Sequence, residues 1–470
     1  MRDPHEASRV EVRSPYSGEL IESLPAVGAG EIAAAIDRAH RALDTELPAH
    51  RRVEILEGVA ERLEAGKEGL AELLALEAGK PLAGGREEVE RAATTARLAG
   101  AEAGRLAGEL IPLDGTGQGG GRLAFTRRVP VGVVGAITPF NFPLNLVMHK
   151  VAPAVAAGCP VILKPAEKTP LSARRLVAMF GAAGLPPDRL RALVGDPAEI
   201  GAALCRDPRV KLITFTGSAQ VGAALQDQAP RKRVALELGN ATPVIVTEEV
   251  DVELVADKLA RGAFGFAGQA CISVQRIYVA AAIGDRLTRA IVARAEALRC
   301  GDPLDPAVEV GPLIDGQARD RVLAIVADAR RRGAAQLTGG HLDGNLIAPV
   351  VLTGAGPEAR VEKEEVFGPV VSINRFTSVE DAVRRANATE YGLQAAVFTN
   401  RLDLAMDVSA RLDFAGVLVN ESPSYRADAM PYGGFKASGN TKEGPSRAVR
   451  EMTEEKLFVI NLDSVAAALA

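Results

Sequence analysis

The sequence predicts an α/β protein whose main sheets are parallel. One observation is a set of near-continuous apolar runs, typical of strands buried on both faces, at residues 131–138, 161–163, 211–216 and 234–238. Another is that helical patterns separate these runs, at residues 145–157, 172–181 and 199–207. Strands that alternate with helices form βαβ units, which place the strands side by side in one parallel sheet.

A second α/β series follows without a linker or an internal repeat. Strand-like runs occur at residues 244–247, 275–279, 370–376, 395–399 and 416–419, with a helix over 252–266. The same alternation of strand and helix predicts a second domain of the same class. Two α/β domains that share a tight interface therefore account for most of the chain.

The flanking segments carry their own patterns. Apolar residues recur at helical spacing over residues 32–43 and 56–74, and the second run stops at a helix-ending Gly79-Lys80-Pro81. A polar, glycine-rich stretch at 115–121 indicates a turn between two strands, and residues 456–462 indicate a final strand.

Composition excludes several classes of partner. The 470 residues have a net charge of −5 and no basic block, so neither nucleic acid nor an anionic membrane is expected to bind. Apolar runs fall short of the ~20 residues that a membrane helix needs. The charged start lacks the apolar core of a signal peptide, which makes a cytoplasmic location the expectation. The four scattered cysteines predict reduced thiols, and the five histidines show no metal-ligand spacing.

Cys271 and Glu237 are the residues best suited to covalent chemistry. Each stands where an apolar run opens into glycine, in Gly268-Gln269-Ala270-Cys271 and in Leu236-Glu237-Leu238-Gly239. A thiol and a carboxylate at the ends of elements suit a mechanism in which the thiol attacks and the carboxylate activates water. A buried cysteine is more often an inert small hydrophobic residue, so the surrounding motifs must decide.

Three further segments place polar residues or glycine where a strand gives way to a helix or turn. They contain Asn141, the pair Lys164 and Glu167, and Gly217 with Ser218. A fourth segment, with Glu365 and Phe367, puts an acid, an aromatic ring and a turn together ahead of a strand. Such strand ends are where α/β folds bind ligands, and a glycine there lets helix N–H groups approach a pyrophosphate. Taken singly, the segments have plainer interpretations as a helix N-cap, a surface ion pair, a turn and a solvated acidic loop.

Taken together, in this order and spacing, the segments resemble the aldehyde dehydrogenase superfamily, from about residue 15 to residue 462. The resemblance implies the aldehyde dehydrogenase fold, in which a Rossmann-like cofactor domain adjoins an α/β catalytic domain. The NAD-binding domain would comprise residues 1–108 and 129–239, and the catalytic domain residues 240–445. A small β oligomerisation element would comprise residues 109–128 and 446–470. A homodimer or homotetramer is expected on the same ground.

The resemblance also implies catalytic roles. Cys271 would be the nucleophile, and because a free thiol has a pKa of about 8.5, a local base or positive dipole should assist its ionisation. Asn141 and the backbone N–H of Cys271 would form the oxyanion hole. Glu237 would activate the water that releases the carboxylic acid. Relatives that transfer the acyl group to coenzyme A usually lack a glutamate there, so hydrolysis is expected.

The cofactor site implied by the resemblance lies at the strand ends. Its residues would be Thr138, Pro139, Phe140, Lys164, Glu167, Gly217, Ser218, Glu365 and Phe367. Lys164 and Glu167 would hold the adenine ribose. A carboxylate there favours a free 2′-hydroxyl over a 2′-phosphate, so NAD is expected, with NADP possible if Glu167 swings aside. Asn240 and the run 439–444 depart from the usual family pattern and leave the local loop geometry open.

Substrate choice should come from residues that line the tunnel to Cys271. The candidates are Phe142, Asn145 and His149 on one helix face, Arg426 and Tyr432 on the opposite wall, and Ile272 at the bottom. Their polarity predicts a short aldehyde with a polar or anionic far end, clamped by Arg426 with help from His149.

Three alternatives stay open at this point. Arg426 could instead pair with Asp428 or Glu421 and simply support its loop. The enzyme could transfer its acyl group to coenzyme A, or act on short aldehydes generally without an anion clamp. A catalytically idle family member would be expected to lack Cys271, Asn141 or Glu237, and all three are present.

Overall fold

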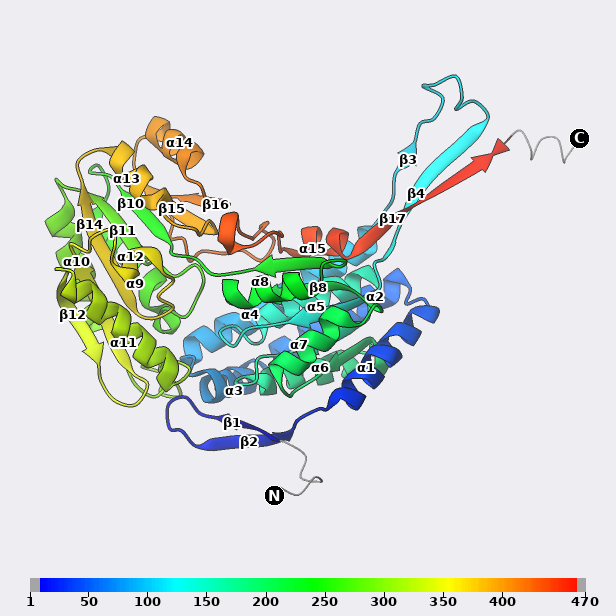
Figure 1. Cartoon of the computed structure of the whole chain (residues 1–470), viewed down its shortest axis with the longest axis horizontal. Helices are drawn as coiled ribbons and strands as arrows, with labels where there is room; N and C mark the ends of the chain where they lie inside the picture. The colour runs from blue at the N-terminus through cyan, green and yellow to red at the C-terminus, as the bar shows by residue number, and fades with distance from the viewer. Residues whose placement is uncertain (1–8, 463–470) are drawn as a thin grey trace, which may run out of the picture.

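The computed structural model of the chain describes residues 9–462 and confirms the α/β class (Figure 1). Its first sheet is five-stranded and parallel, in the order β7-β6-β5-β8-β9. The strands are β5 (Val133–Ile137), β6 (Val161–Lys164), β7 (Leu190–Ala192), β8 (Val210–Thr216) and β9 (Arg233–Glu237). Every residue of β5 is buried, as the apolar run predicted, because helices cover both faces of the sheet.

Eight helices accompany this sheet in residues 9–239. They are α1 (Ala29–Arg41), α2 (Ala49–Ala65), α3 (Lys67–Ala78), α4 (Leu82–Arg105), α5 (Asn145–Ala157), α6 (Pro170–Ala182), α7 (Pro197–Arg206) and α8 (Ala219–Gln228). Val134 packs into the hydrophobic cluster of α2, α4, α5 and α6, whereas Val133 packs into that of α1, α7 and α8. Successive strand side chains point to opposite faces, so the two clusters lie on the two sides of the sheet.

Two parts of this helical layer differ from the prediction. The single pattern over residues 56–74 is two helices, α2 and α3, which meet at Gly66. Helix α4 was not predicted, because its buried face consists mainly of alanine and glycine and gives only a faint hydrophobic period. Among residues 9–462, none of the helices combines the length and the apolar character needed to span a membrane.

The second sheet has seven strands in the order β12-β13-β14-β11-β10-β15-β16. They are β10 (Pro243–Val246), β11 (Arg276–Ala280), β12 (Ala335–His341), β13 (Ile347–Thr353), β14 (Val370–Phe376), β15 (Gln394–Phe398) and β16 (Gly416–Val419). Its helices are α9 (Val252–Phe264), α10 (Gly284–Ala297), α11 (Gly316–Arg331), α12 (Arg360–Lys363), α13 (Val379–Asn387) and α14 (Leu402–Arg411). The β12–β13 pair was not predicted. It is antiparallel, which makes the sheet mixed rather than purely parallel.

The third sheet is an antiparallel arm that projects from the body (Figure 1). It comprises β3 (Leu110–Ile111), β4 (Arg122–Pro130) and β17 (Thr453–Asn461), and β17 pairs with β4 from Thr453↔Pro130 to Asn461↔Arg122. The glycine-rich turn and the final strand were both predicted, although the strand begins three residues earlier than expected. The shorter elements are β1 (Arg9–Arg13), β2 (Leu20–Pro25) and α15 (Pro445–Glu451), which packs on α4 and α5.

A buried ion pair connects α3, α4 and the start of α5. The ammonium of Lys80 and the carboxylate of Glu88 contact each other, and neither side chain is more than 1% exposed. The other Glu88 oxygen accepts from the backbone N–H groups of Leu144 (2.9 Å) and Asn145 (3.0 Å). Lys80 Nζ also lies 3.7 Å from the ring centroid of Phe142. The pair therefore fixes the first turn of α5 and the loop that leads into it.

We expect Lys80→Met to lower the free energy of unfolding by about 3–5 kcal/mol, because it leaves the Glu88 carboxylate buried without its cation. Lys67→Met is the matched control, since it removes an exposed lysine that pairs with Glu90 of α4 and should cost less than about 1 kcal/mol. Adding Glu88→Gln to Lys80→Met should recover part of the loss. Urea unfolding midpoints measure all three, and similar losses for Lys80→Met and Lys67→Met would contradict this assignment.

Candidate active site

Cys271 lies in a strained loop between α9 and β11. Phe266 (φ 50°) and Ala267 (φ 52°) adopt left-handed backbone conformations that side chains other than glycine rarely take, and Gly268 (φ 69°) continues the turn. A Cβ on Gly268 would lie 2.2 Å from the Gly368 carbonyl oxygen, so only glycine fits. Such strain persists where the surrounding structure fixes it, often at functional sites. Here it brings the loop that carries Cys271 to the carboxyl edge of the five-stranded sheet, where Asn141 meets it.

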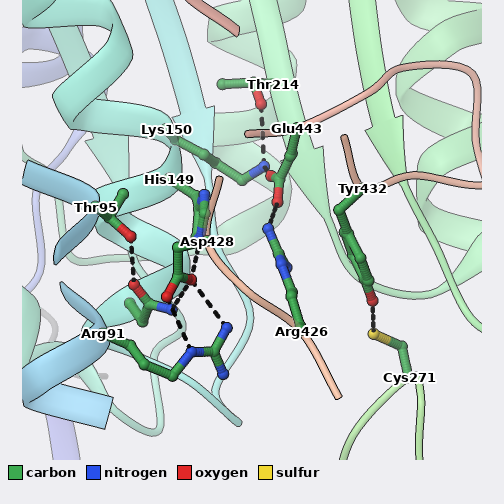
Figure 2. Close-up of polar contacts among 11 residues, drawn as sticks. Arg91, Thr95, His149, Lys150, Thr214, Cys271, Arg426, Asp428, Tyr432 and Glu443 are labelled. Atoms are coloured by element: carbon green, nitrogen blue, oxygen red, sulfur yellow. Dashed lines mark hydrogen bonds and ion pairs between the residues drawn. The ribbon is translucent and has the colours of Figure 1, made fainter. Parts of the chain in front are cut away.

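The Cys271 thiol contacts a phenol. Its Sγ lies 2.7 Å from the hydroxyl of Tyr432 (Figure 2). Burial raises the pKa of Cys271 to about 12, and the hydrogen bond to Tyr432 acts in the opposite direction, as does the charge of Arg426. The sequence led us to expect a base or a positive dipole beside the thiol. The group bonded to it is instead an uncharged phenol.

Glu237 is the last residue of β9 and is 2% exposed. Neither oxygen of its carboxylate has a hydrogen-bond partner. A Cβ on Gly433 would lie 2.4 Å from its Oε1, so the glycine makes room for the acid. Burial and the nearby Glu443 raise the pKa of Glu237 well above its usual range, against the opposing charges of Lys150, Arg426 and Lys442. A carboxylate with a raised pKa is a stronger base than an ordinary glutamate, so it is better able to take a proton from water.

Asn141 follows β5 and is hydrogen-bonded to the loop that carries Cys271. Its Nδ2 donates to the Gln269 carbonyl at 2.9 Å, while its buried Oδ1 has no partner. Gln269 is itself held by the backbone, since its Oε1 accepts from the N–H of Ile314 at 2.9 Å. An amide nitrogen carries two hydrogens, so one donor of Asn141 is left for a ligand.

The predicted cofactor residues gather at the carboxyl ends of β5, β6 and β8. Lys164 is buried and donates to Glu167 at 2.9 Å, and the Glu167 side chain is 44% exposed. Ser218 caps α8, where its hydroxyl accepts from the Val221 N–H at 3.4 Å. A Cβ on Gly217 would lie 2.5 Å from the Phe215 ring, which explains the glycine. Thr138, at the end of β5, is buried with an unpartnered hydroxyl, and Pro139 beside it is partly exposed.

Glu365 and Phe367 reach the same edge from the other sheet. Burial raises the pKa of Glu365 to about 7, although its carboxylate accepts from the Asn240 N–H at 3.0 Å. The Phe367 ring packs edge to face on Phe140, with centroids 5.8 Å apart. Residues from the two predicted domains are thus in direct contact at the cleft.

Arg426 and Tyr432 form one wall beside the thiol. The Arg426 guanidinium lies 3.7 Å from the Tyr432 ring centroid and donates from Nη2 to Glu443 at 3.2 Å. Its side chain is 5% exposed, and its Nε has no partner. The two partners considered from sequence are engaged elsewhere, because Asp428 pairs with Arg91 and Glu421 with Lys258. Glu443 was not considered.

Asn145 and His149 belong to a buried network around Asp428. Figure 2 shows His149 and Arg91 on either side of this carboxylate. His149 Nε2 lies 2.8 Å and Asn145 Nδ2 3.1 Å from Asp428 Oδ1. The Asn145 Oδ1 accepts from the Thr95 hydroxyl. Burial, and then the charge of Arg426, lower the pKa of His149, so the ring is neutral at neutral pH. That His149 helps Arg426 to clamp an anion stays a prediction, and a neutral ring would help by hydrogen bonding rather than by charge.

The two apolar pocket residues pack close to the site. Phe142 lies edge to face with Phe266, with centroids 6.1 Å apart. Ile272 forms a small cluster with Leu393 and Tyr432, against which Cys271 packs. Ile272 therefore lies next to Cys271, and Phe142 contacts the loop that carries it.

Lys150 and Glu443 were missed from sequence. Lys150 Nζ donates to Glu443 at 2.9 Å and to the Thr214 hydroxyl at 3.0 Å. Burial would raise the pKa of Glu443, but Lys150 and Arg426 outweigh it and hold the pKa at about 2. The signal was that Lys150 stands in a helix with no other Lys, Arg, Asp or Glu, because a buried cation requires a partner.

The two departures from the usual pattern have structural roles. Asn440 Oδ1 accepts from the Leu236 N–H at 2.8 Å, and its Nδ2 donates to the Val234 carbonyl at 3.0 Å. The Asn240 amide donates to Thr242 and to the Gln394 carbonyl. Both asparagines therefore support the strand that carries Glu237 and the turn after it.

The comparisons with known proteins identify the family. A sequence model of the aldehyde dehydrogenase family matches residues 2–458. The 3-sulfolactaldehyde dehydrogenase of Priestia megaterium is 42% identical over 97% of this chain and 96% of its own. The lactaldehyde dehydrogenase of Methanocaldococcus jannaschii is 39% identical over 96% of this chain and 97% of its own.

Among solved structures, the glyceraldehyde-3-phosphate dehydrogenase GapN of Methanocaldococcus jannaschii, crystallised with NADP, superposes with a TM-score of 0.93. It is 39% identical and covers 96% of this chain and 99% of its own. The family match spans nearly the whole chain, and the two dehydrogenases compared by sequence align with it over nearly their whole lengths. The chain therefore belongs to the aldehyde dehydrogenase family and is an enzyme of that class.

Proposed function

We propose that this enzyme oxidises short aldehydes with a polar or anionic far end to carboxylic acids, with NAD or NADP as hydride acceptor. The observation that carries the substrate class is the guanidinium of Arg426. It is buried near the thiol, and its Nε has no protein partner. A guanidinium suits carboxylate, sulfonate and phosphate groups, because it presents several donors in one plane.

The residues of the cleft support a thioester mechanism. The Cys271 thiolate attacks the aldehyde carbon, and the oxyanion that forms accepts hydrogen bonds from the free Asn141 donor and the Cys271 N–H. A nicotinamide held at the strand ends would supply the acceptor for the hydride that leaves the former aldehyde carbon. Glu237 then removes a proton from water, whose oxygen attacks the thioester; the acid leaves and the Cys271 sulfur is regenerated.

The strand ends fit a dinucleotide. The orphaned Thr138 hydroxyl, the N-terminus of α8 and the Lys164–Glu167 pair offer donors and acceptors along one edge. Lys164 and Glu167 would hold the adenine ribose, Gly217 and Ser218 the pyrophosphate, and Glu365 and Phe367 the nicotinamide end. Glu167 would repel a 2′-phosphate, which favours NAD, yet its partly exposed side chain can turn away to admit NADP.

The relatives support the polarity of the substrate. One is named for an aldehyde with a sulfonate, one for a phosphorylated aldehyde, and one for a neutral hydroxyaldehyde. Two of these three aldehydes carry an anionic group, a sulfonate or a phosphate. The clamp at Arg426 gives a physical reason why this chain would prefer that kind.

An absorbance assay at the band of the reduced nicotinamide tests the proposed function. Purified enzyme would be given anionic aldehydes (succinic semialdehyde, glyceraldehyde 3-phosphate, sulfoacetaldehyde) and neutral ones (lactaldehyde, propanal), each with NAD and with NADP. We expect the highest kcat/KM on an anionic aldehyde, without coenzyme A. Better turnover of the neutral members would favour a general short-chain enzyme. Turnover that appears only after coenzyme A is added would indicate acyl transfer instead of hydrolysis.

The pH dependence of thioester hydrolysis tests Glu237. Because burial raises its pKa well above the usual range, the carboxylate is protonated at low pH and cannot act as a base. Hydrolysis should therefore rise about tenfold per pH unit below that raised pKa and level off above it. p-Nitrophenyl acetate acylates the same thiol without a cofactor, so its steady-state hydrolysis isolates this step.

Glu237→Gln should lower that hydrolysis by about 10²–10⁴-fold, while the first burst of nitrophenol persists. A wild-type rate that does not change with pH, or a variant that turns over normally, would rule out Glu237 as the base.

Arg426→Leu tests the clamp. We expect its KM for anionic aldehydes to rise by about 10- to 100-fold, because a hydrogen bond to a charged group is lost, and its KM for propanal to change by less than about threefold. For Arg426→Lys, which keeps the charge but not the planar donors, the KM for anionic aldehydes should lie between those of the wild type and of Arg426→Leu. An equal loss on propanal would show that Arg426 only supports its loop.

We also propose that the arm joins this chain to a second copy in a homodimer or homotetramer. Leu457, Val459 and Ile460 of β17 are exposed, as are Leu110 and Leu123 on the other two strands. Apolar strands at the edge of a small sheet favour pairing with another chain.

A further inference from the structure

The hydroxyl of Tyr432 touches the atom that would react. It lies 2.7 Å from Cys271 Sγ, and Figure 2 shows the tyrosine ring pointing its oxygen at the sulfur. The mechanism above uses Tyr432 only as a wall. A packing role needs an aromatic ring but not a hydroxyl, so the contact calls for its own explanation.

The tyrosine is held so that its oxygen stays in place. Its backbone exchanges two hydrogen bonds with Glu443, from the Tyr432 N–H (3.0 Å) and from the Glu443 N–H (2.6 Å). The side chain of the same Glu443 binds Arg426, which lies flat on the ring at 3.7 Å from its centroid. Tyr432 is 5% exposed. Backbone, glutamate and guanidinium thus fix the ring in one position.

We propose that Tyr432 is a catalytic residue that donates a hydrogen bond to the Cys271 thiolate and so promotes its formation. This rests on the proposed function, in which Cys271 is the nucleophile. In the uncharged pair, either group can donate. After the thiol has lost its proton, only the phenol can donate, and the contact becomes a charge-assisted O–H···S⁻ bond, which is stronger. The bond therefore favours the ionised form over the neutral one.

The surroundings of Cys271 include groups that oppose a thiolate and groups that favour it. Glu237 and Glu365 disfavour a thiolate, while Arg426 and Tyr432 favour it, and burial opposes it most. Burial also raises the pKa of Tyr432 well above its usual value, so the phenol keeps its proton while the thiol loses one. Arg426 acts on the phenol through the ring face, because a cation over an aromatic ring draws electron density from it. Arg426 is then a positioning residue for Tyr432 as well as the candidate clamp.

Alkylation by iodoacetamide measures the thiolate directly, without aldehyde or cofactor. The thiol proton goes to solvent, the sulfur forms a bond to the CH₂ carbon, and iodide leaves. The parent protein should carry Cys300→Ser, since Cys159 and Cys205 are buried and Cys300 is partly exposed. Mass spectrometry of the peptide that contains Cys271 gives the rate at each pH from 6 to 10.

We expect Tyr432→Phe to slow alkylation of Cys271 by about tenfold at pH 8, equivalent to a thiol pKa about one unit higher. Tyr425→Phe is the matched control, because Tyr425 lies in the same loop with 52% exposure, and its alkylation should match that of the parent. A Tyr432→Phe profile within twofold of the control at every pH would overturn the proposal.

Replacing Tyr432 by 3-fluorotyrosine provides a second test that does not remove the hydroxyl. The fluorinated phenol is a more acidic donor of nearly the same size, so alkylation should become faster at pH 8. An unchanged rate would overturn the proposal even if Tyr432→Phe failed to fold. Since neither experiment uses an aldehyde, a parent enzyme that oxidises none of the panel would refute the proposed function and leave this result standing.

Discussion

The buried ion pair between Lys150 and Glu443 connects the parts of the cleft that must act together. Lys150 comes from α5, which follows the Asn141 loop, and Glu443 from the segment that returns after the second sheet. Through Glu443 the pair also fixes Arg426, Tyr432 and, by contact, the sulfur of Cys271. Without Lys150 as partner, Glu443 would be a buried acid next to Glu237 with a single cation left to neutralise it.

Charge balance in this small volume explains why the two acids differ. Glu443 touches two cations and stays ionised, whereas Glu237 touches none and is driven toward its protonated form by burial and by Glu443 itself. Two carboxyl groups whose surroundings push their pKa values apart can take separate roles. One acts as a fixed anion that orients Arg426, and the other is free to exchange a proton.

The sequence predicted the parallel sheets well because their strands are buried on both faces and have distinct apolar runs. It predicted less where burial depends on small residues, as in α4, or where a strand is half exposed and carries glycines, as in β12. Glu237 could be predicted because it ends a recognisable strand, whereas Asn141 and Cys271 lie in loops and were predicted from the motifs around them. The partner of Arg426 could not, since Glu443 is 17 residues away and only the fold decides which of the nearby acids it meets.

The predicted roles of Asn145 and His149 show where reasoning by helix periodicity ends. Their spacing correctly placed them on one face of α5, but that face meets Asp428 and Thr95 rather than open space. A helical face predicts which side chains point together, not what they point at. Buried polar groups that lack a hydrogen-bond partner are a better guide to a ligand site. Among them are the Glu237 carboxylate, Asn141 Oδ1, Arg426 Nε and the Thr138 hydroxyl.

Each such group costs the folded state about 1–3 kcal/mol unless something binds it. Most buried polar groups in proteins are satisfied, so a cluster of exceptions requires an explanation. Here Glu237, Asn141 and Arg426 come from segments far apart in sequence and lie beside the Cys271 loop, whereas other exceptions, such as Arg52 and Ser409, belong to α2 and α14. Water would donate to Glu237 and to Asn141 Oδ1, an anion would accept from Arg426 Nε, and a cofactor hydroxyl would pair with the Thr138 hydroxyl; all of these take part in the proposed reaction. The stability that the fold gives up at this cleft is the physical basis for expecting a ligand there.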